Sequence, residues 1–254
     1  MLASGSKGNC IYIAGGGTAL LIDAGISARE TLARLAAAGI NHNSIRSILF
    51  THDHSDHCKG ARVLSRKLEA QLYANAQTAD AIEHNDRALT EGFNIFDSCT
   101  PFEIGDLKIE PFAVPHDASD PVGFVMDDGR SRIGIVTDLG QATDLCVYKL
   151  LNCDLIVVES NHDLELLRTS NRAWSLIQRI EGRSGHLSND DAAALIKAVA
   201  TGRLRKIILA HLSQDCNTPR LARETTMTAL HGIGLSSIPV VVASQHEAGE
   251  LLTI

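Results

Sequence analysis

The stretch that decides the fold runs from Ser47 to His57 and reads Ser-Ile-Leu-Phe-Thr-His-Asp-His-Ser-Asp-His. Its short apolar run, residues 48–50, predicts a buried strand. Within the next residues the chain places three imidazoles and a carboxylate: His52, His54, Asp56 and His57. Such a group at the end of one strand is typical of ligands for more than one transition-metal ion.

The composition predicts a soluble globular protein. The chain has 254 residues, of which 44% are hydrophobic and 21% charged, and this length is enough to bury a large core. We therefore expect one domain over residues 1–254. Aromatic residues make up only 4% of the chain, so the core must be aliphatic and platforms for base stacking are scarce.

The charge is unevenly distributed along the chain. The formal net charge of −7 gives no overall signature of nucleic-acid binding. Residues 160–225, however, contain ten Lys/Arg against seven Asp/Glu, a balance of +3. An acidic ligand would be met by this C-terminal third, although scattered surface charge explains the balance equally well.

Six cysteines occur without CxxC pairing or regular spacing. No signal peptide is recognisable at the first residues, and no run approaches the ~18 apolar residues of a membrane span. We expect a cytoplasmic protein with reduced thiols. Cys58 adjoins the histidine cluster and could be a ligand or a redox-sensitive group, but a packing role is favoured.

The order of expected elements indicates a layered α/β (α+β) fold. Strands at 9–13 and 18–22 are followed by a helix that Ser27 and Glu30 open as a capping box and Gly39 closes. The segment from 85 to 101 is expected to be less regular. Further helices are expected at 61–68, 78–84, 141–151, 171–181 and 189–201, and further strands at 71–74, 107–112, 122–126, 132–137, 155–159, 206–210 and 239–242. Sheets covered by outer helices, an αββα sandwich, fit this order.

Five apolar strands each end in a residue that can ionise or bind metal. These residues are Asp23, His52, Asp138, Glu159 and His211. His116 also follows an apolar stretch. A single Asp at a strand end is usually a turn residue, but five such ends predict loops gathered over a rigid sheet at a catalytic site.

The spacing within His-x-His-x-Asp-His has a geometric meaning. His52 and His54 alternate along an extended segment and can hold one metal, and Asp56 and His57 can reach a second after the turn. A carboxylate such as Asp138 could bridge the two. Bridged metal pairs at ~3.5–4 Å are typical of two-metal hydrolases.

These motifs together resemble the metallo-β-lactamase-fold hydrolases. The resemblance implies the four-layer αβ/βα sandwich of that superfamily. It also implies that His52, His54 and His116 hold a first metal, and that Asp23 orients a ligand histidine. The implied ligands of the second metal are Asp56, His57 and His211, with Asp138 between the two metals.

A closer resemblance, to the YycJ/WalJ (VicX) branch, covers nearly the whole chain. It rests on residues 3–10 (ASGSKGNC), 51–57 (THDHSDH), 115–118 (PHDA), 120–124 (DPVGF), 159–163 (ESNHD), 185–189 (GHLSN), 210–213 (AHLS) and 217–219 (NTP). Members of that branch are bacterial cytosolic nucleases associated with 5′→3′ exonuclease action on DNA.

Two further histidines are candidates for substrate contact. Ser188 can N-cap the next helix, and this helix start would fix His186 at the mouth of a site. His186 resembles the histidine that RNase Z-type nucleases place near the scissile phosphate as a proton donor; the alternative is a loop histidine. His162 is either a substrate contact, a residue beside the metals, or a structural residue.

The function that we predict is a two-metal phosphodiesterase in which metal-activated water attacks the phosphodiester. Asp56 would orient or deprotonate the water, and His186 would protonate the leaving oxygen. Flanking phosphates of DNA would be held by arginines of the basic segment, with Arg168, Arg172 and Arg183 as candidates. Nitrogen and oxygen ligands admit zinc, manganese or iron, and a homodimer is compatible with the sequence.

A small-molecule ester, thioester or lactone hydrolase on the same scaffold is the alternative. The few aromatic residues and the negative net charge favour it. A non-catalytic binding module is disfavoured, because such a module would have no use for a complete set of seven metal ligands.

Overall fold

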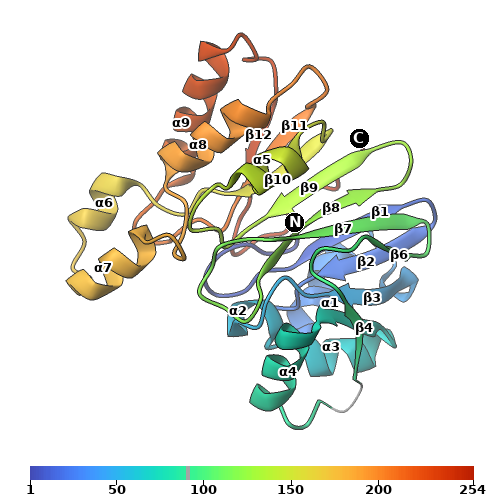
Figure 1. Ribbon diagram of the computed structural model, residues 1–254. Coiled ribbons are helices and arrows are strands. Elements are labelled where there is room, and N and C mark those ends of the chain that lie inside the picture. Colours follow the sequence, from blue (N-terminus) through green and yellow to red (C-terminus); the bar gives the residue numbers. More distant parts are fainter. Residues whose placement is uncertain (90–91) are drawn as a thin grey trace. The chain divides into compact units, whose positions relative to one another are not determined.

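The computed structural model describes residues 1–89 and 92–254, and the chain separates into two units. Unit 1 contains residues 1–113, 118–122 and 244–253, and unit 2 contains residues 114–117, 123–243 and 254. Each unit has a sheet with helices packed beside it (Figure 1). One domain over residues 1–254 stays a prediction.

Unit 1 is built on a five-stranded sheet in the order β1-β2-β3-β4-β5. Its strands are β1 (Ile11–Gly15), β2 (Thr18–Ile22), β3 (Ile45–Leu49), β4 (Gln71–Asn75) and β5 (Phe93–Phe96). β1 and β2 form an antiparallel hairpin, and β2 to β5 are parallel. Because parallel strands share one carboxyl edge, Asp23 after β2 and Thr51 after β3 emerge close together.

The helices of unit 1 follow its parallel strands. They are α1 (Ala28–Ala37), α2 (Ser55–Cys58), α3 (Ala61–Leu68) and α4 (Ala76–Asn85), with a short 3₁₀ turn η1 (His42–Ser44). The Ser27 side chain accepts a hydrogen bond from the Glu30 amide at the start of α1, as the capping signature predicts. β6 (Phe102–Ile104) and β7 (Leu107–Ala113) form an antiparallel hairpin at the end of this unit.

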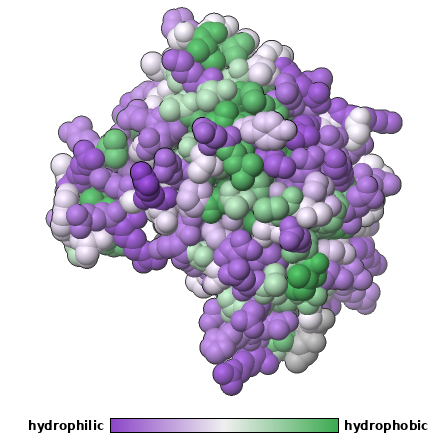
Figure 2. All heavy atoms as spheres, viewed as in Figure 1, coloured by the Kyte–Doolittle hydropathy of each residue, from purple (hydrophilic) through white to green (hydrophobic). Residues whose placement is uncertain are grey.

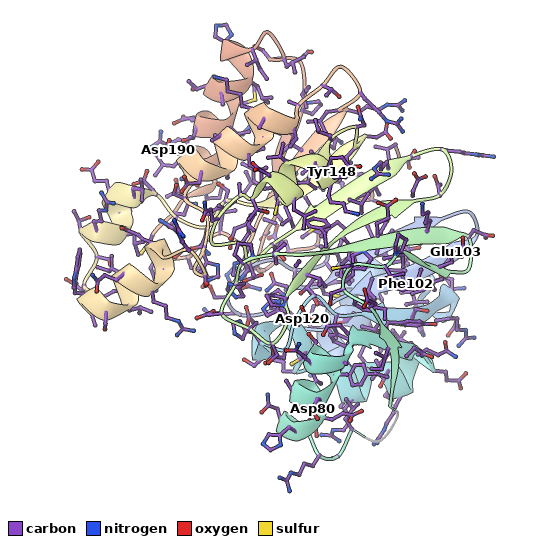
Figure 3. The ribbon with its side chains drawn as sticks, in the orientation of Figure 1. Asp80, Phe102, Glu103, Asp120, Tyr148 and Asp190 are labelled. Atoms are coloured by element: carbon purple, nitrogen blue, oxygen red, sulfur yellow. The ribbon has the colours of Figure 1, made fainter. Side chains whose placement is uncertain are left out.

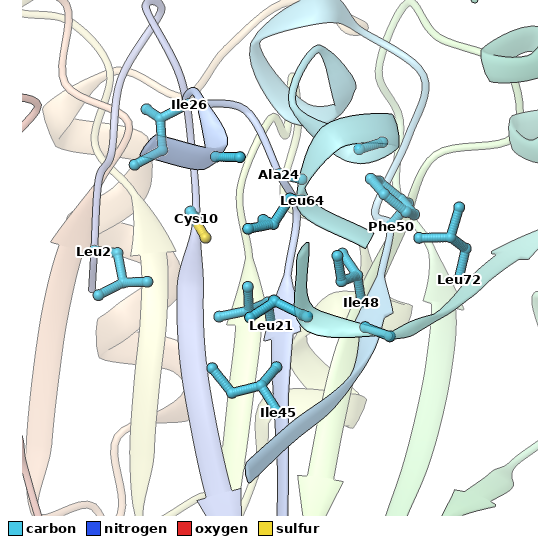
Figure 4. Packing of buried hydrophobic residues seen from close by; sticks show 14 of the residues in the cluster. Leu2, Cys10, Leu21, Ala24, Ile26, Ile45, Ile48, Phe50, Leu64 and Leu72 are labelled. Carbon is cyan, nitrogen blue, oxygen red and sulfur yellow. The ribbon is translucent and has the colours of Figure 1, made fainter. Parts of the chain in front are cut away.

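The core of unit 1 is aliphatic, as the low aromatic content predicts. Leu21 of β2 and Ile48 of β3 are fully buried side by side, and Leu64 of α3 packs over them (Figure 4). Phe50 closes the end of this cluster nearest the histidine motif. The strand that carries the motif is therefore anchored by burial, which fixes where its last residues emerge.

Unit 2 has a sheet in the order β12-β11-β10-β9-β8. Its strands are β8 (Val122–Asp127), β9 (Arg132–Val136), β10 (Leu155–Glu159), β11 (Lys206–Ala210) and β12 (Val240–Val242). β8 and β9 are antiparallel, and β9 to β12 are parallel. The parallel strands β9, β10 and β11 therefore deliver Asp138, Glu159 and His211 to one edge of the sheet.

Five helices belong to unit 2 in its described part. They are α5 (Asp144–Leu150), α6 (Leu164–Arg168), α7 (Trp174–Glu181), α8 (Asn189–Val199) and α9 (Pro219–Gly232). Ser188 caps α8 by accepting from the Asp191 amide, and Asp190 and Asp191 lie in the first turn, as predicted. α5, α8 and α9 lie along the sheet, whereas α6 and α7 project away from it (Figure 1).

The structure corrects three expectations about secondary structure. The segment 85–101 contains β5, whose two middle residues, Asn94 and Ile95, are both exposed, so that the strand lacks the alternation of buried and exposed residues. The helix expected at 171–181 begins only at Trp174, after a separate short helix α6. The 14-residue helix α9 was not expected at all, although Thr218 and Pro219 form a helix start of the ordinary kind.

Most large apolar side chains are buried, and those that are exposed are scattered among hydrophilic residues (Figure 2). Tyr148, labelled in Figure 3, projects from α5 with 71% of its surface exposed. No helix within residues 1–89 and 92–254 combines the length and the apolar character needed to cross a membrane.

Candidate metal centre

Asp23 holds His57 in a defined orientation. Its Oδ2 lies 2.8 Å from His57 Nδ1, and its Oδ1 accepts a hydrogen bond from the Thr51 amide at 2.9 Å. A carboxylate only accepts, so Nδ1 of His57 carries the proton and the ring presents Nε2 as its ligand atom. Both side chains are buried. This is how ligand histidines are usually oriented by a carboxylate.

The other histidines of the motif gather around His57. The ring of His52 lies 4.0 Å from that of His57 and 4.7 Å from that of His54, measured between centroids. His52 Nδ1 lies 2.9 Å from the hydroxyl of Thr51. His52 is buried, and His54 is partly exposed. Unit 1 thus brings the three imidazoles of the motif together.

Asn9 joins this group, and its role was not predicted. Its amide nitrogen lies 2.9 Å from His57 Nε2 and 3.3 Å from Asp56 Oδ2, and Gly5 N donates to its oxygen. Asp56 Oδ2 is itself 3.6 Å from His57 Nε2. The glycine-rich start of the chain therefore places the side-chain amide of Asn9 against two candidate metal ligands, Asp56 and His57. In the sequence, the motif at residues 3–10 was the feature that could have pointed to Asn9.

Gly25 keeps the backbone of this loop in close contact with the motif. A Cβ at this position would lie 1.6 Å from the carbonyl oxygen of Asp56. We expect Gly25→Ala to displace Asp56 and to lower the free energy of unfolding by about 1–3 kcal/mol, because the neighbour is backbone. Urea unfolding measures this change. Gly202→Ala, whose Cβ would meet nothing within 4 Å, is the matched control, and an equal loss in both variants would contradict the argument.

Glu159 is the centre of the cluster in unit 2. Its Oε1 accepts from His186 Nδ1 at 2.8 Å and from His211 Nδ1 at 2.9 Å. Its Oε2 accepts from the amides of Leu139 and Leu187 at 3.0 and 3.1 Å. The side chain is fully buried. Both histidines must therefore carry a proton on Nδ1, and Nε2 of each is the ring nitrogen left for a ligand or a second proton.

Asp138 and His116 complete this cluster. Asp138 Oδ1 lies 3.5 Å from His211 Nδ1, 3.8 Å from His186 Nδ1 and 3.9 Å from His116 Nε2. Asp138, Glu159, His186 and His211 each offer a ligand atom, and these atoms all lie within 4.8 Å of one another. Nitrogen and carboxylate donors at this spacing fit a divalent transition metal.

His116 is oriented by the backbone. Its Nδ1 donates to the carbonyl oxygen of Gly185 at 3.0 Å, so this ring also presents Nε2. Gly185 precedes His186, and the rings of His116 and His186 lie 5.1 Å apart. The loop at residues 185–186 therefore has two roles. The carbonyl group of Gly185 orients His116, and the next residue of the loop is His186.

The shared carboxylate changes the ionisation of its neighbours. Burial alone raises the pKa of Glu159, but the charge of His186 and the hydrogen bonds from both histidines outweigh it and hold that pKa at about 2. Burial also lowers the pKa of His186, and the Glu159 carboxylate reverses this effect and raises it. His186 is thus favoured as a proton-carrying group.

The backbone is strained where site residues emerge. Six non-glycine residues of the described chain have left-handed backbone angles, and three of them are Asp23 (φ 62°), Asp138 (φ 55°) and His211 (φ 54°). All three follow parallel strands. Backbone strain of this kind gathers at functional sites, where the surrounding structure compensates for it.

His162 is buried, with only 1% of its surface exposed. Neither ring nitrogen has a hydrogen-bond partner among the described residues, and burial lowers its pKa. Its backbone carbonyl accepts from the amide of Asn189 at 2.8 Å. Burying an imidazole without hydrogen-bond partners lowers the free energy of unfolding. The side chain of His162 therefore does not stabilise the fold through hydrogen bonds.

The three candidate arginines differ in their surroundings. Arg168 makes two hydrogen bonds to Glu181, at 2.8 and 3.1 Å, and Arg172 makes one to Asp215 at 3.0 Å. Arg183 is exposed and lines a cavity of about 540 Å³ beside Asp191.

Cys58 donates its thiol proton to the carbonyl oxygen of Asp53 at 3.3 Å, and burial raises its pKa to about 12. The thiol therefore stays protonated at neutral pH, which favours the packing role.

Comparison with known proteins places the chain in a family. Residues 18–211 match the family described as "Beta-lactamase superfamily domain". The exodeoxyribonuclease YycJ of Bacillus anthracis is 38% identical over 92% of this chain and 89% of its own length. The exodeoxyribonuclease WalJ of Streptococcus pneumoniae (strain D39) is also 38% identical, over 91% of this chain and 87% of its own.

A solved structure agrees on the fold. The metallo-β-lactamase-fold protein YhfI of Bacillus subtilis superposes with a TM-score of 0.71 at 16% identity, covering 96% of this chain and 95% of that one. The predicted mixed α/β fold class is thereby confirmed. The chain belongs to the metallo-β-lactamase-fold superfamily of metal-dependent hydrolases, in its YycJ/WalJ-like branch.

Proposed function

We propose that this hydrolase is a two-metal phosphodiesterase that degrades DNA from its 5′ ends. The observation that carries the proposal is His186, whose Nδ1 is held by the buried Glu159 while its pKa is raised. A histidine of this kind is suited to protonate a leaving oxygen. The names of the relatives at 38% identity support DNA as the substrate.

The proposed ligands are those that the motif resemblance implies. His52, His54 and His116 would hold one metal. Asp56, His57 and His211 would hold the second, and Asp138 would contribute to both. The hydrogen bonds of the histidines fit this set, because the Nδ1 atoms of His57, His116 and His211 donate to oxygen acceptors and Nε2 is the ligand atom in each. Zinc or manganese suits these donors, and iron(II) is compatible with them.

When bound, the two metal ions supply positive charge and lower the pKa of coordinated water. Asp56, held by Asn9, would orient the attacking water and accept its proton. His186 gives the proton on Nε2 to the leaving oxygen, while Glu159 keeps the imidazole in place and stabilises its charged form.

Substrate contacts are proposed at His162 and at the arginines. His162 has two ring nitrogens that no described residue engages, which supports a polar ligand at this position. Only 1% of the residue is exposed, so such a contact requires the neighbouring residues to move. Arg183 is exposed and lines a cavity. Arg168 and Arg172 must exchange their surface carboxylates for phosphate, which costs little because exposed ion pairs are weak. A reducing, cytoplasmic setting suits the six unbridged cysteines.

Asp23→Asn tests the proposed orientation of His57. The carboxylate of Asp23 accepts hydrogen bonds from the backbone N–H of Thr51 and from His57 Nδ1. The side-chain amide of asparagine has a single oxygen acceptor and cannot accept both of them in this geometry. We expect affinity for Zn²⁺ or Mn²⁺ to fall about 10–100-fold, as measured by competition with a chelator. Asp53→Asn is the matched control, because Asp53 belongs to the same motif but its carboxylate accepts from the Ser119 amide rather than from a histidine. Equal affinities in the two variants would argue against the orienting role.

The substrate assay uses DNA labelled at either end. With Mn²⁺ or Zn²⁺, the protein is expected to release mononucleotides from 5′-labelled single- or double-stranded DNA early in the reaction, and EDTA is expected to stop the release. No hydrolysis of DNA with any divalent metal, together with turnover of a thioester or lactone, would overturn the proposal in favour of a small-molecule hydrolase.

A further inference from the structure

The helices α6 and α7 form a small arm of unit 2 that is separate from the sheet (Figure 1). The arm, residues 164–183, has its own small core of Leu167 and Ile177, to which Cys216 contributes, with Ile180 packed against it. Because this core already supports the arm, apolar side chains on its outer surface are not needed for its packing.

Trp174 lies on that outer surface. It is the only tryptophan of the chain, it is the first residue of α7, and 63% of its surface is exposed. Leu166 and Leu176 of the same arm are each 37% exposed, and Figure 2 shows hydrophobic spheres among hydrophilic ones over this part of the molecule. An exposed indole is typical of binding surfaces, since it offers a large flat area with a polar edge.

The charge of the arm selects the kind of ligand. Residues 164–183 contain four arginines against two glutamates, a balance of +2, whereas the whole chain has −7. Arg168 and Arg179 are 58% and 64% exposed in their side chains. They pair with the carboxylates of Glu181 and Asp117, and such exposed pairs are weak enough to be replaced by phosphate.

We propose that the α6–α7 arm binds single-stranded DNA by stacking a base on Trp174, with phosphates held by Arg168, Arg172 and Arg179. A base can stack on an indole only when it is unstacked from its own strand, so the arm selects single strands over duplex. The inference rests on the proposed function, since it assigns the part of the protein that engages the DNA substrate beyond the scissile bond.

Binding is tested on the full-length, metal-loaded protein with a fluorescent, phosphorothioate-linked 12-mer of thymidine, whose linkages resist hydrolysis. Trp174→Ala is expected to weaken binding about 5- to 100-fold, the range for loss of one stacked base. Trp174→Phe should restore part of the affinity. Tyr148→Ala on α5 removes another exposed aromatic side chain (Figure 3) and should change nothing.

The tryptophan also reports directly on its own contact. Because Trp174 is the sole tryptophan, stacking should quench the intrinsic fluorescence of the wild-type protein with the same midpoint as the binding curve. Affinity unchanged in Trp174→Ala, or no quenching at saturation, would overturn the inference. So would a dimer of the wild-type protein that Trp174→Ala converts to monomer without loss of DNA affinity, because the arm would then bind a second copy.

The proposed function fails by a different result. If the wild-type protein hydrolyses neither DNA nor the small phosphodiester bis(p-nitrophenyl) phosphate, it is not a phosphodiesterase. The binding and quenching measurements need no hydrolysis, so they test the role of the arm independently of catalysis.

Discussion

Replacing His186 by alanine is expected to lower the turnover of DNA by about 10²–10⁴-fold, the usual contribution of a positioned general acid. The imidazole is held at Nδ1 by Glu159, and the carboxylate raises its pKa, which favours the protonated form that a general acid needs. Alanine removes that proton donor and leaves Asp138 and His211 in place. Initial rates on 5′-labelled DNA measure the effect.

Metal analysis of the same variant separates two roles. His186 offers a ligand atom within 4.8 Å of those of Asp138 and His211, so it has the position of a ligand as well as that of a proton donor. A metal content equal to that of the wild type supports the proton donor. Loss of metal would show a ligand instead. His231→Ala, which removes a surface histidine bonded to Ser236, should leave both rate and metal content unchanged.

Glu159→Gln is expected to cost stability as well as activity. The Glu159 carboxylate is surrounded by donors: the two histidine rings on Oε1 and two backbone amides on Oε2. A glutamine turns one of these acceptors into a donor, so two buried N–H groups lose their partner whichever way the amide faces. Breaking a buried charged pair in this way costs about 3–5 kcal/mol.

Activity should fall in Glu159→Gln because a neutral amide no longer stabilises the charged form of His186. His186 and His211 also lose their acceptor wherever the amide nitrogen faces them. Unfolding by urea and DNA hydrolysis measure the two effects on one preparation. Asp154→Asn is the matched control, since Asp154 is a buried carboxylate of unit 2 that accepts from Arg132 and Arg203 rather than from a histidine. It should lose stability and keep its catalytic rate. If Asp154→Asn and Glu159→Gln lose the same stability and the same activity, Glu159 has only a structural role.

The sequence predicts those parts of the site that are local in the chain. The motif 51–57 is contiguous, so its histidines lie close together in space because they are close in sequence. The preceding buried strand determines where in the fold they lie. The strand ends at Asp23, Asp138 and His211 were also identified, because apolar runs followed by single polar residues mark the carboxyl ends of parallel strands. The family and the fold class are confirmed by comparison; the ligand assignment stays a prediction.

Contacts between distant segments could not be derived in this way. Glu159 was recognised as a strand-end residue, but its role depends on the loop at Leu187 and on His211, which lie 28 and 52 residues away. Asn9 reaches His57 across 48 residues. No local sequence pattern predicts that one carboxylate accepts hydrogen bonds from two distant histidines. That arrangement forms only after the strands have paired in register in the sheet.

The left-handed backbone at Asp23, Asp138 and His211 restricts which residues evolution can place there. Gly enters this region freely, and Asn, Asp and His enter it at a lower steric cost than residues with longer or branched side chains. Glutamate is the nearest chemical substitute for aspartate, yet it is a poor one at Asp138, where asparagine is the better fit to the main chain. At these positions the conformation of the main chain therefore limits which residues are acceptable, independently of the chemistry of the site.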